Sequence, residues 1–178
     1  MSTDIKNINL SADVPLDAFI RRISRMVEQW FGQTGEILPL WIVVQRDGAA
    51  YVIGTPFFAD ASDPYGDAAK ATIAEDMRRH FAEHDVIRYA HLAEAWMTER
   101  SMASSKEILA GKVELCRPRL DPARKEVITI YAQDGGGALN GVRDIIRPRG
   151  GKSYLGKLDL CPGGGGRFGD LLPQPHLH

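Results

Sequence analysis

Residues 38–54 of the chain, LPLWIVVQRDGAAYVIG, contain the pattern that decides the fold. Two runs rich in β-branched and aromatic residues, 38–44 and 50–54, flank the pair Asp47-Gly48. An Asp-Gly pair between such runs favours a tight turn that joins two antiparallel strands. This stretch therefore predicts a β-hairpin.

An amphipathic pattern on each side of this hairpin predicts a helix. Over about residues 15–31, apolar side chains recur at three- and four-residue spacings, Pro15 suits the first turn and Gly32 suits the end. Over about residues 67–84, a second apolar stripe contains Ala69, Ile73, Met77, His80 and Phe81. Stripes of this kind usually pack against a core.

Several later segments predict strands. Residues 125–132 alternate in the way that a half-buried strand does, and residues 113–116, 142–146 and 153–160 are also β-like. Residues 86–99 fit both a helical stripe and a strand-like alternation. We favour a strand there, because a continuous helix over 67–99 would be unusually long.

This order of elements predicts an α+β fold, with a mainly antiparallel sheet and the helices 15–31 and 67–84 packed on one face. The length of 178 residues and the hydrophobic content of 44% suit one domain. We expect a single α+β domain over residues 1–161. We expect residues 162–178, which are rich in Gly and Pro, to form an irregular C-terminal tail with few groups to bury.

The cysteine content and the lengths of the apolar runs indicate in which cellular compartment the protein is expected. Cys116 and Cys161 are too few for a disulfide framework, and we expect two free thiols. The N-terminus has no basic start followed by an apolar run, and no apolar run is long enough to cross a bilayer. These observations predict a soluble cytoplasmic protein without a membrane partner.

The net charge of −1 is the sum of two opposite halves. Residues 1–110 carry 11 basic and 16 acidic residues, whereas residues 111–178 carry 11 basic and 7 acidic residues. Of the 18 glycines, 12 lie at or beyond Gly135. The total excludes a strongly basic nucleic-acid protein and an acidic disordered chain.

The sharpest short motif is His80-Phe81-Ala82-Glu83-His84, which has the pattern H-x-x-E-H. Two imidazoles at i and i+4 on a helix can hold Zn²⁺, and Glu83 would then activate the metal-bound water as the catalytic base. The motif makes His80 and His84 candidate zinc ligands. Against this, no glutamate follows Glu126 to serve as the downstream third ligand.

A second group of polar residues surrounds the segment 86–99 and the strand 125–132. If these segments are neighbouring strands, Glu94 and Glu126 approach each other, with Arg119 or Arg124 as a partner. Paired carboxylates with an arginine suit acid–base catalysis, and Glu94 and Glu126 are therefore candidate catalytic residues. We favour a structural ion pair at a strand end, which the same residues form equally well.

The basic back of the chain supplies the remaining candidates, Arg143, Arg147, Arg149, Lys152 and Lys157. Together with Arg167, they are interleaved with Tyr154, Phe168 and many glycines. Arginine and aromatic side chains on a glycine-rich backbone bind phosphates and stack on bases. We expect a small binding or accessory protein whose basic C-terminal third contacts an anionic partner or another subunit of a homo-oligomer. A nucleic acid is one such anionic partner. The alternative is a metal-dependent hydrolase that uses the H-x-x-E-H helix.

Overall fold

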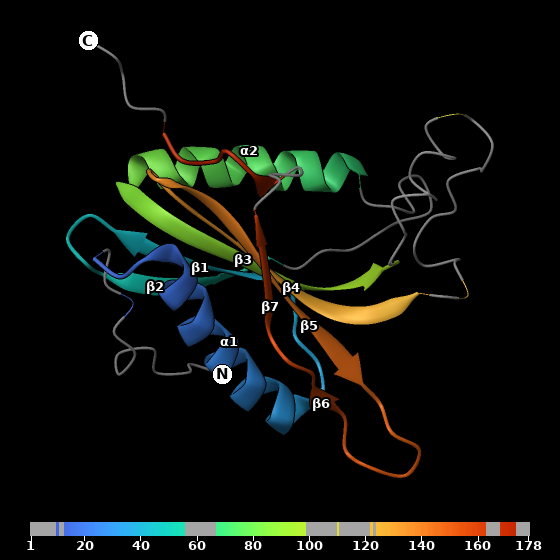
Figure 1. Cartoon of the computed structure of the whole chain (residues 1–178). Coiled ribbons are helices and arrows are strands. Elements are labelled where there is room, and N and C mark those ends of the chain that lie inside the picture. Colours follow the sequence, from blue (N-terminus) through green and yellow to red (C-terminus); the bar gives the residue numbers. More distant parts are fainter. Residues whose placement is uncertain are drawn as a thin grey trace.

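The computed structural model describes residues 10, 13–55, 67–98, 110, 122, 124–162 and 168–173. Its sheet lies between two helices, with α1 on one side and α2 on the other (Figure 1). The elements are α1 (Leu16–Thr34), β1 (Leu40–Gln45), β2 (Ala50–Gly54), α2 (Asp67–Glu83), β3 (Val86–Met97), β4 (Lys125–Asp134), β5 (Gly137–Ile146), β6 (Tyr154–Leu155) and β7 (Asp159–Pro162).

The strands form one sheet in the order β2-β1-β3-β4-β5-β6, and β7 also pairs with β5. Every strand pair is antiparallel. The predicted α+β class, with two helices on an antiparallel sheet, is therefore confirmed. The hairpin is also present, since β1 pairs with β2 and Gly48 adopts the positive φ of 87° that its turn requires.

Both helices form close to the predicted bounds. The first one continues for three residues beyond Phe31 and ends at Gly35, whose left-handed backbone (φ 76°) directs its N–H to the Phe31 carbonyl oxygen at 2.7 Å. Gly32, which the sequence indicated as the end, lies inside this helix. A left-handed glycine just past the last turn satisfies a backbone carbonyl that would otherwise lack a partner.

The helices pack on opposite faces of the sheet, and the expectation that they share one face was wrong in this respect. Below α1, the core contains Phe19, Ile20 and Ile23 with Ile42, Val44, Leu92 and Ile130. Below α2, a separate core contains Met77 and Phe81 with Trp41, Val43, Tyr89 and Tyr131. Successive β1 residues therefore alternate between two cores, and a continuous apolar strand needs cover on both faces.

The central strands confirm one prediction and extend another. Residues 86–97 form the strand β3, which pairs with β1 and β4. The predicted strand 142–146 begins earlier, at Gly137, and the predicted strand 153–160 is divided into β6 and β7. The predicted strand 113–116 lies outside the described residues.

Part of the C-terminal tail completes the core under α2. Residues 168–173 contain neither an α-helix nor a strand, but Leu171 is buried and Phe168 packs against the Trp41 ring at 5.2 Å. Gln133 Nε2 donates to Asp170 Oδ1 at 3.0 Å, and the Asp170 N–H donates to Gln133 Oε1 at 2.8 Å. The expectation that this tail has little to bury was therefore wrong for Leu171.

The α1 helix packs closely over β5 at Gly141. A Cβ atom built at Gly141 would lie 2.8 Å from Ile20 Cγ2 and 3.0 Å from Leu158 Cδ1. Such separations are shorter than van der Waals contact, so glycine is needed here for close approach. Within the described part of the chain, neither helix is both long and apolar enough to span a bilayer.

Candidate functional site

The sheet brings Glu94 and Glu126 together at the end where β3 finishes and β4 begins. The register pairs Trp96 with Glu126 and Glu94 with Ile128, so the two carboxylates are diagonal neighbours. Both lie on the α1 face, because Ile128 belongs to the core below α1. The predicted approach of Glu94 and Glu126 is thus present.

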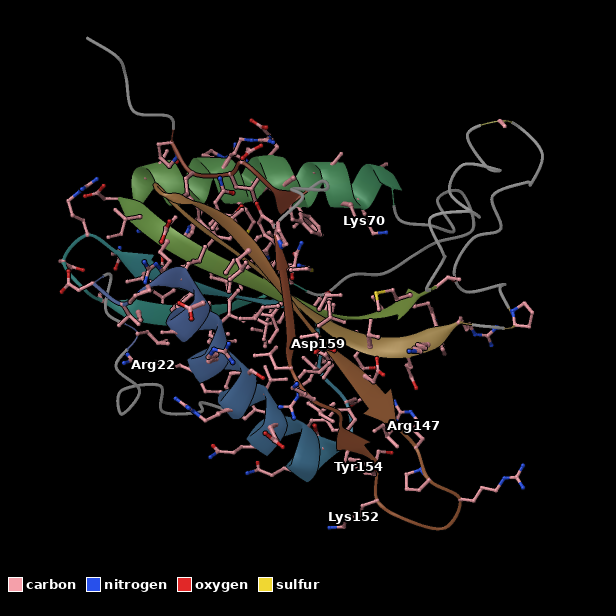
Figure 2. The ribbon with its side chains drawn as sticks, in the orientation of Figure 1. Arg22, Lys70, Arg147, Lys152, Tyr154 and Asp159 are labelled. Carbon is pink, nitrogen blue, oxygen red and sulfur yellow. The ribbon has the colours of Figure 1, made fainter. Side chains whose placement is uncertain are left out.

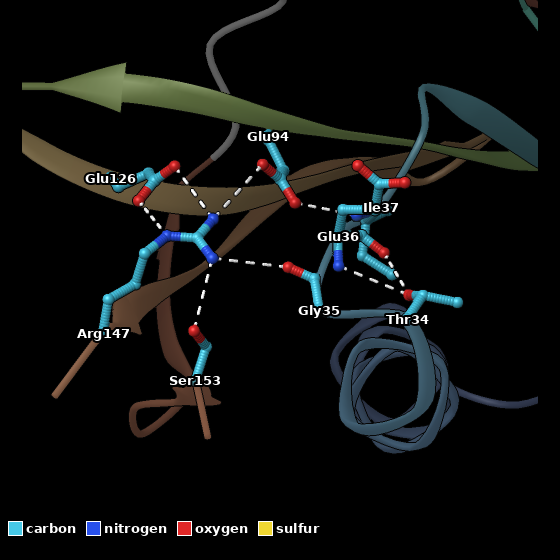
Figure 3. Close-up of polar contacts among 8 residues, drawn as sticks. All are labelled: Thr34, Gly35, Glu36, Ile37, Glu94, Glu126, Arg147 and Ser153. Atoms are coloured by element: carbon cyan, nitrogen blue, oxygen red, sulfur yellow. Dashed lines mark hydrogen bonds and ion pairs between the residues drawn. The ribbon is translucent and has the colours of Figure 1, made fainter. Parts of the chain in front are cut away.

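Their arginine partner is Arg147, at the end of β5, rather than Arg119 or Arg124 (Figure 3). Arg147 Nε and Nη2 donate to the two Glu126 oxygens at 2.7 and 3.0 Å, a bidentate pair. Its Nη2 also lies 4.0 Å from Glu94 Oε2. Arg124 stacks instead on the Trp96 ring at 4.8 Å, and Arg119 lies outside the described residues.

The guanidinium also ties two loops together. Arg147 Nη1 donates to the Ser153 hydroxyl at 3.3 Å and to the Gly35 carbonyl oxygen at 3.5 Å (Figure 3). Arg147 therefore joins the segment after β5 to the residue that ends α1. Hydrogen bonding to Glu126 raises the pKa of Arg147, so the guanidinium stays charged.

Glu94 is held by the loop between α1 and β1. The Ile37 N–H donates to Glu94 Oε1 at 2.7 Å. Burial raises the pKa of the Glu94 carboxyl, and the Ile37 N–H and the Arg147 charge oppose part of that rise. Because both Glu126 oxygens and one Glu94 oxygen already accept hydrogen bonds, this arrangement is better suited to positioning loops than to accepting a substrate proton.

Two of the five predicted basic residues form ion pairs with carboxylates of the same chain. Arg147 belongs to the carboxylate cluster, and Arg143 is buried between β5, β6 and α1. Arg143 donates to the Gly156 carbonyl oxygen at 2.7 Å and to Glu28 Oε2 at 3.0 Å. With a side chain only 8% exposed, Arg143 has little surface to offer a partner.

The other three, Arg149, Lys152 and Lys157, are exposed. They belong to residues 147–157, which we call the cationic segment; its turn, between Arg147 and Tyr154, extends beyond β5, and β6 then runs back along β5 (Figure 2). No acidic residue occurs in the sequence between Asp144 and Asp159. None of the three forms an ion pair within the described residues.

The predicted metal residues lie at the C-terminal end of α2. The His80 and His84 rings are neighbours, with centroids 4.2 Å apart. His80 Nε2 is 2.9 Å from the Tyr51 hydroxyl, and Glu83 lines an open depression with His80. Burial and the neighbouring His84 lower the pKa of His80, which favours the neutral imidazole that metals bind. Among the described residues, no group of three or more potential ligands gathers here or elsewhere.

Sequence reasoning missed the exposure of Trp96, which is 44% exposed, whereas Tyr154, which the sequence placed among the basic residues, is 54% exposed. The free thiol predicted for Cys161 is present and exposed, whereas Cys116 lies outside the described residues.

Comparison of the chain with protein-family models, with curated proteins and with solved structures finds no match.

Proposed function

We propose that the chain is a binding protein that holds an anionic partner through the cationic segment, residues 147–157. The observation that carries this proposal is the exposure of Arg149, Lys152 and Lys157 within one short segment, residues 147–157, that contains no acidic residue. Cations clustered without compensating carboxylates create a local positive potential, although the whole chain is close to neutral.

The contacts at the base of this segment support the proposal. Arg147 is fixed by Glu126 and bonds to Ser153, and Arg143 bonds to the backbone of Leu155 and Gly156. These contacts hold the segment at both ends and leave Arg149 and Lys152, which lie between them, exposed. A segment ordered before binding loses less conformational entropy when a partner is captured.

The test measures polyanion binding by fluorescence anisotropy with labelled inorganic polyphosphate at low ionic strength. The double variant Arg149→Gln/Lys152→Gln removes two charges from the segment, and we expect binding to weaken about tenfold or more. The matched control Arg21→Gln/Arg25→Gln removes two charges from exposed positions of α1 and should bind as the unchanged protein does.

Sedimentation velocity on the same variants tests the other expected partner, a second copy of the chain. If the segment joins subunits, the double variant will sediment more slowly than the control. If the double variant changes the assembly but not polyphosphate binding, the segment contacts another subunit and not an anionic partner.

A further inference from the structure

The last described stretch of the chain, residues 168–173, lies alongside α2 on the same face of the sheet (Figure 1). We call this stretch the C-terminal strap. The centroid of its Phe168 ring lies 5.2 Å from that of Trp41 and 4.5 Å from that of His91. Leu171 is 1% exposed and belongs to the core below α2. Two apolar side chains, three residues apart, thus anchor the strap in the way that anchor residues hold a peptide in a groove.

Polar groups of the sheet bind the strap between these two anchors. The Tyr89 hydroxyl donates to the Phe168 carbonyl oxygen at 2.8 Å. The Gln133 amide accepts the Asp170 N–H at 2.8 Å and donates to Asp170 Oδ1 at 3.0 Å. Because Gln133 is only 9% exposed, leaving its amide without these partners is costly. We call the surface that makes all these contacts the strap groove; its residues are Trp41, Tyr89, His91 and Gln133.

The contacts of the strap do not depend on the residues that connect it to the sheet. Strand β7 ends at Pro162, and the connection over residues 163–167 has the sequence Gly-Gly-Gly-Gly-Arg. Glycine has no side chain, so four of these five positions hold no group that ties the strap to its own copy. A connection of this length spans at most about 20 Å when it is extended. The strap can therefore reach the groove of a second copy that lies within that distance of Pro162.

We propose that two copies of the chain exchange their C-terminal straps, so that each strap fills the strap groove of the other copy. The occupant is a second copy because the sequence that fits the groove is the chain's own, with Phe168, Asp170 and Leu171 at the required spacing. Exchange needs no new contact, since each groove gains from the other copy what it loses from its own chain. This interaction does not involve the cationic segment and goes beyond the proposed function.

The length of the connection sets the protein concentration at which exchange occurs. A short connection holds the strap near its own groove at an effective concentration on the order of millimolar, so a dilute chain closes on itself. Deleting residues 163–166 leaves only Arg167 between Pro162 and Phe168 and disfavours this closure. We expect the deletion variant to dimerise at a concentration at least about tenfold lower than the unchanged chain does. Inserting four further glycines is the matched control and should not promote the dimer.

The deciding experiment mixes two full-length variants that each lack one half of the contact. The groove variant, Tyr89→Phe/Gln133→Leu, nearly keeps the volume of the groove but loses its polar groups. The strap variant, Phe168→Ala/Leu171→Ala, keeps the groove but loses both anchors. Sedimentation velocity should show monomers for each variant alone and an equimolar complex in the mixture. In that complex, the strap of the groove variant fills the empty groove of the strap variant.

A further substitution in the groove variant tests the contact with Gln133. Asp170→Ala removes the acceptor that the intact Gln133 of the strap variant needs, so the complex should weaken about tenfold or more. Asp159→Ala removes an exposed carboxylate of β7 outside the strap and is the matched control, which should assemble unchanged. Arg149→Gln/Lys152→Gln should also leave the complex unchanged, which separates this interaction from the proposed anion binding.

A peptide measures docking without a second chain. The peptide of residues 166–175 should raise the midpoint of thermal unfolding of the strap variant by a few degrees, whereas its Asp170→Ala form should not. If the mixture contains monomers only, although the peptide stabilises the strap variant, exchange between copies is overturned. If the strap variant does not fold, the deletion variant decides, because it keeps every residue of the contact, and its failure to dimerise would equally overturn the exchange.

Discussion

Arg143 Nη1 lies 3.0 Å from Glu28 Oε2, a contact that joins β5 to α1 across 115 residues of sequence. The same guanidinium donates to backbone carbonyl oxygens of Leu155 and Gly156 and approaches Ser24 of α1. One buried side chain thus holds β5, β6 and α1 together. Because the Arg143 side chain is only 8% exposed, water can replace few of these hydrogen bonds when the guanidinium is removed.

Arg143→Met should lower the free energy of unfolding by about 2–4 kcal/mol, since it leaves buried carbonyl oxygens without donors. Arg149→Met removes the same charge from an exposed position and should change stability by less than about 0.5 kcal/mol. Urea unfolding measures both variants. Equal effects would show that the Arg143 contacts do not hold the three elements together.

Two glycine-to-alanine substitutions should have opposite signs. Gly141→Ala places a methyl group 2.8 Å from Ile20 Cγ2 and should destabilise the protein by about 1–3 kcal/mol. Gly32 lies within α1, and a Cβ atom there has no neighbour within 4 Å. Gly32→Ala should therefore stabilise by about 0.5–1 kcal/mol. Thermal unfolding checks both, and a neutral Gly141→Ala would contradict the close approach of α1 to β5.

His91 should make stability depend on pH. Its ring contacts the rings of both Trp41 and Phe168, with centroid distances of 4.5 Å to each, and burial lowers its pKa from 6.5 to about 4. As the pH falls from 6.5 to about 4, the unfolded chain binds a proton that the folded chain does not, so stability decreases. The loss from this group is at most about 3 kcal/mol and is complete below the folded pKa.

His91→Phe keeps an aromatic ring in that position and should remove this part of the pH dependence. Urea unfolding of both proteins at about pH 7 and about pH 4.5 gives the difference. The variant should lose less stability on acidification. An unchanged difference between the two pH values would mean that His91 is not buried as a neutral imidazole.

Zinc should not bind stoichiometrically at His80 and His84. Within the described residues the pair lacks a third ligand, and the Tyr51 hydroxyl already lies 2.9 Å from His80 Nε2. Elemental analysis after chelation and reloading tests this expectation. One equivalent of zinc, lost in His80→Ala/His84→Ala, would support the metal-dependent hydrolase instead.

Local patterns in the sequence were sufficient for most of the strands and both helices. The Asp47-Gly48 turn and the alternation of residues 125–132 depend on neighbours in sequence, which a single chain displays directly. The choice of a strand for residues 86–97 also held, because Asp85 separates it from α2 with a φ of 46°.

The placement of the helices on two faces depends on contacts distant in sequence. A signal was nevertheless present, since Trp41, Ile42, Val43 and Val44 form an unbroken apolar run of the kind that is covered on both faces. The continuity of this run therefore indicated that helices cover both faces of the sheet.

The candidate site was partly predictable for the same reason. The approach of Glu94 and Glu126 follows once β3 and β4 are paired, but the identity of their arginine requires the course of the chain after β5. In the sequence, nothing distinguishes Arg143 and Arg147 from Arg149. The first two pair with Glu28 and Glu126 only because the fold brings α1 and β4 next to them, whereas Arg149 stays exposed. Charge counts by segment do not resolve that difference.

The packing of residues 168–173 under α2 also constrains the order of events during synthesis. Trp41 and Tyr89 emerge from the ribosome well before Phe168 and Leu171, which cover them in the finished protein. A nascent chain therefore carries an incompletely covered aromatic surface until translation has passed Leu171. In that interval the surface is available to chaperones and to other nascent chains, so residues 168–171 complete the burial of strands that were made much earlier.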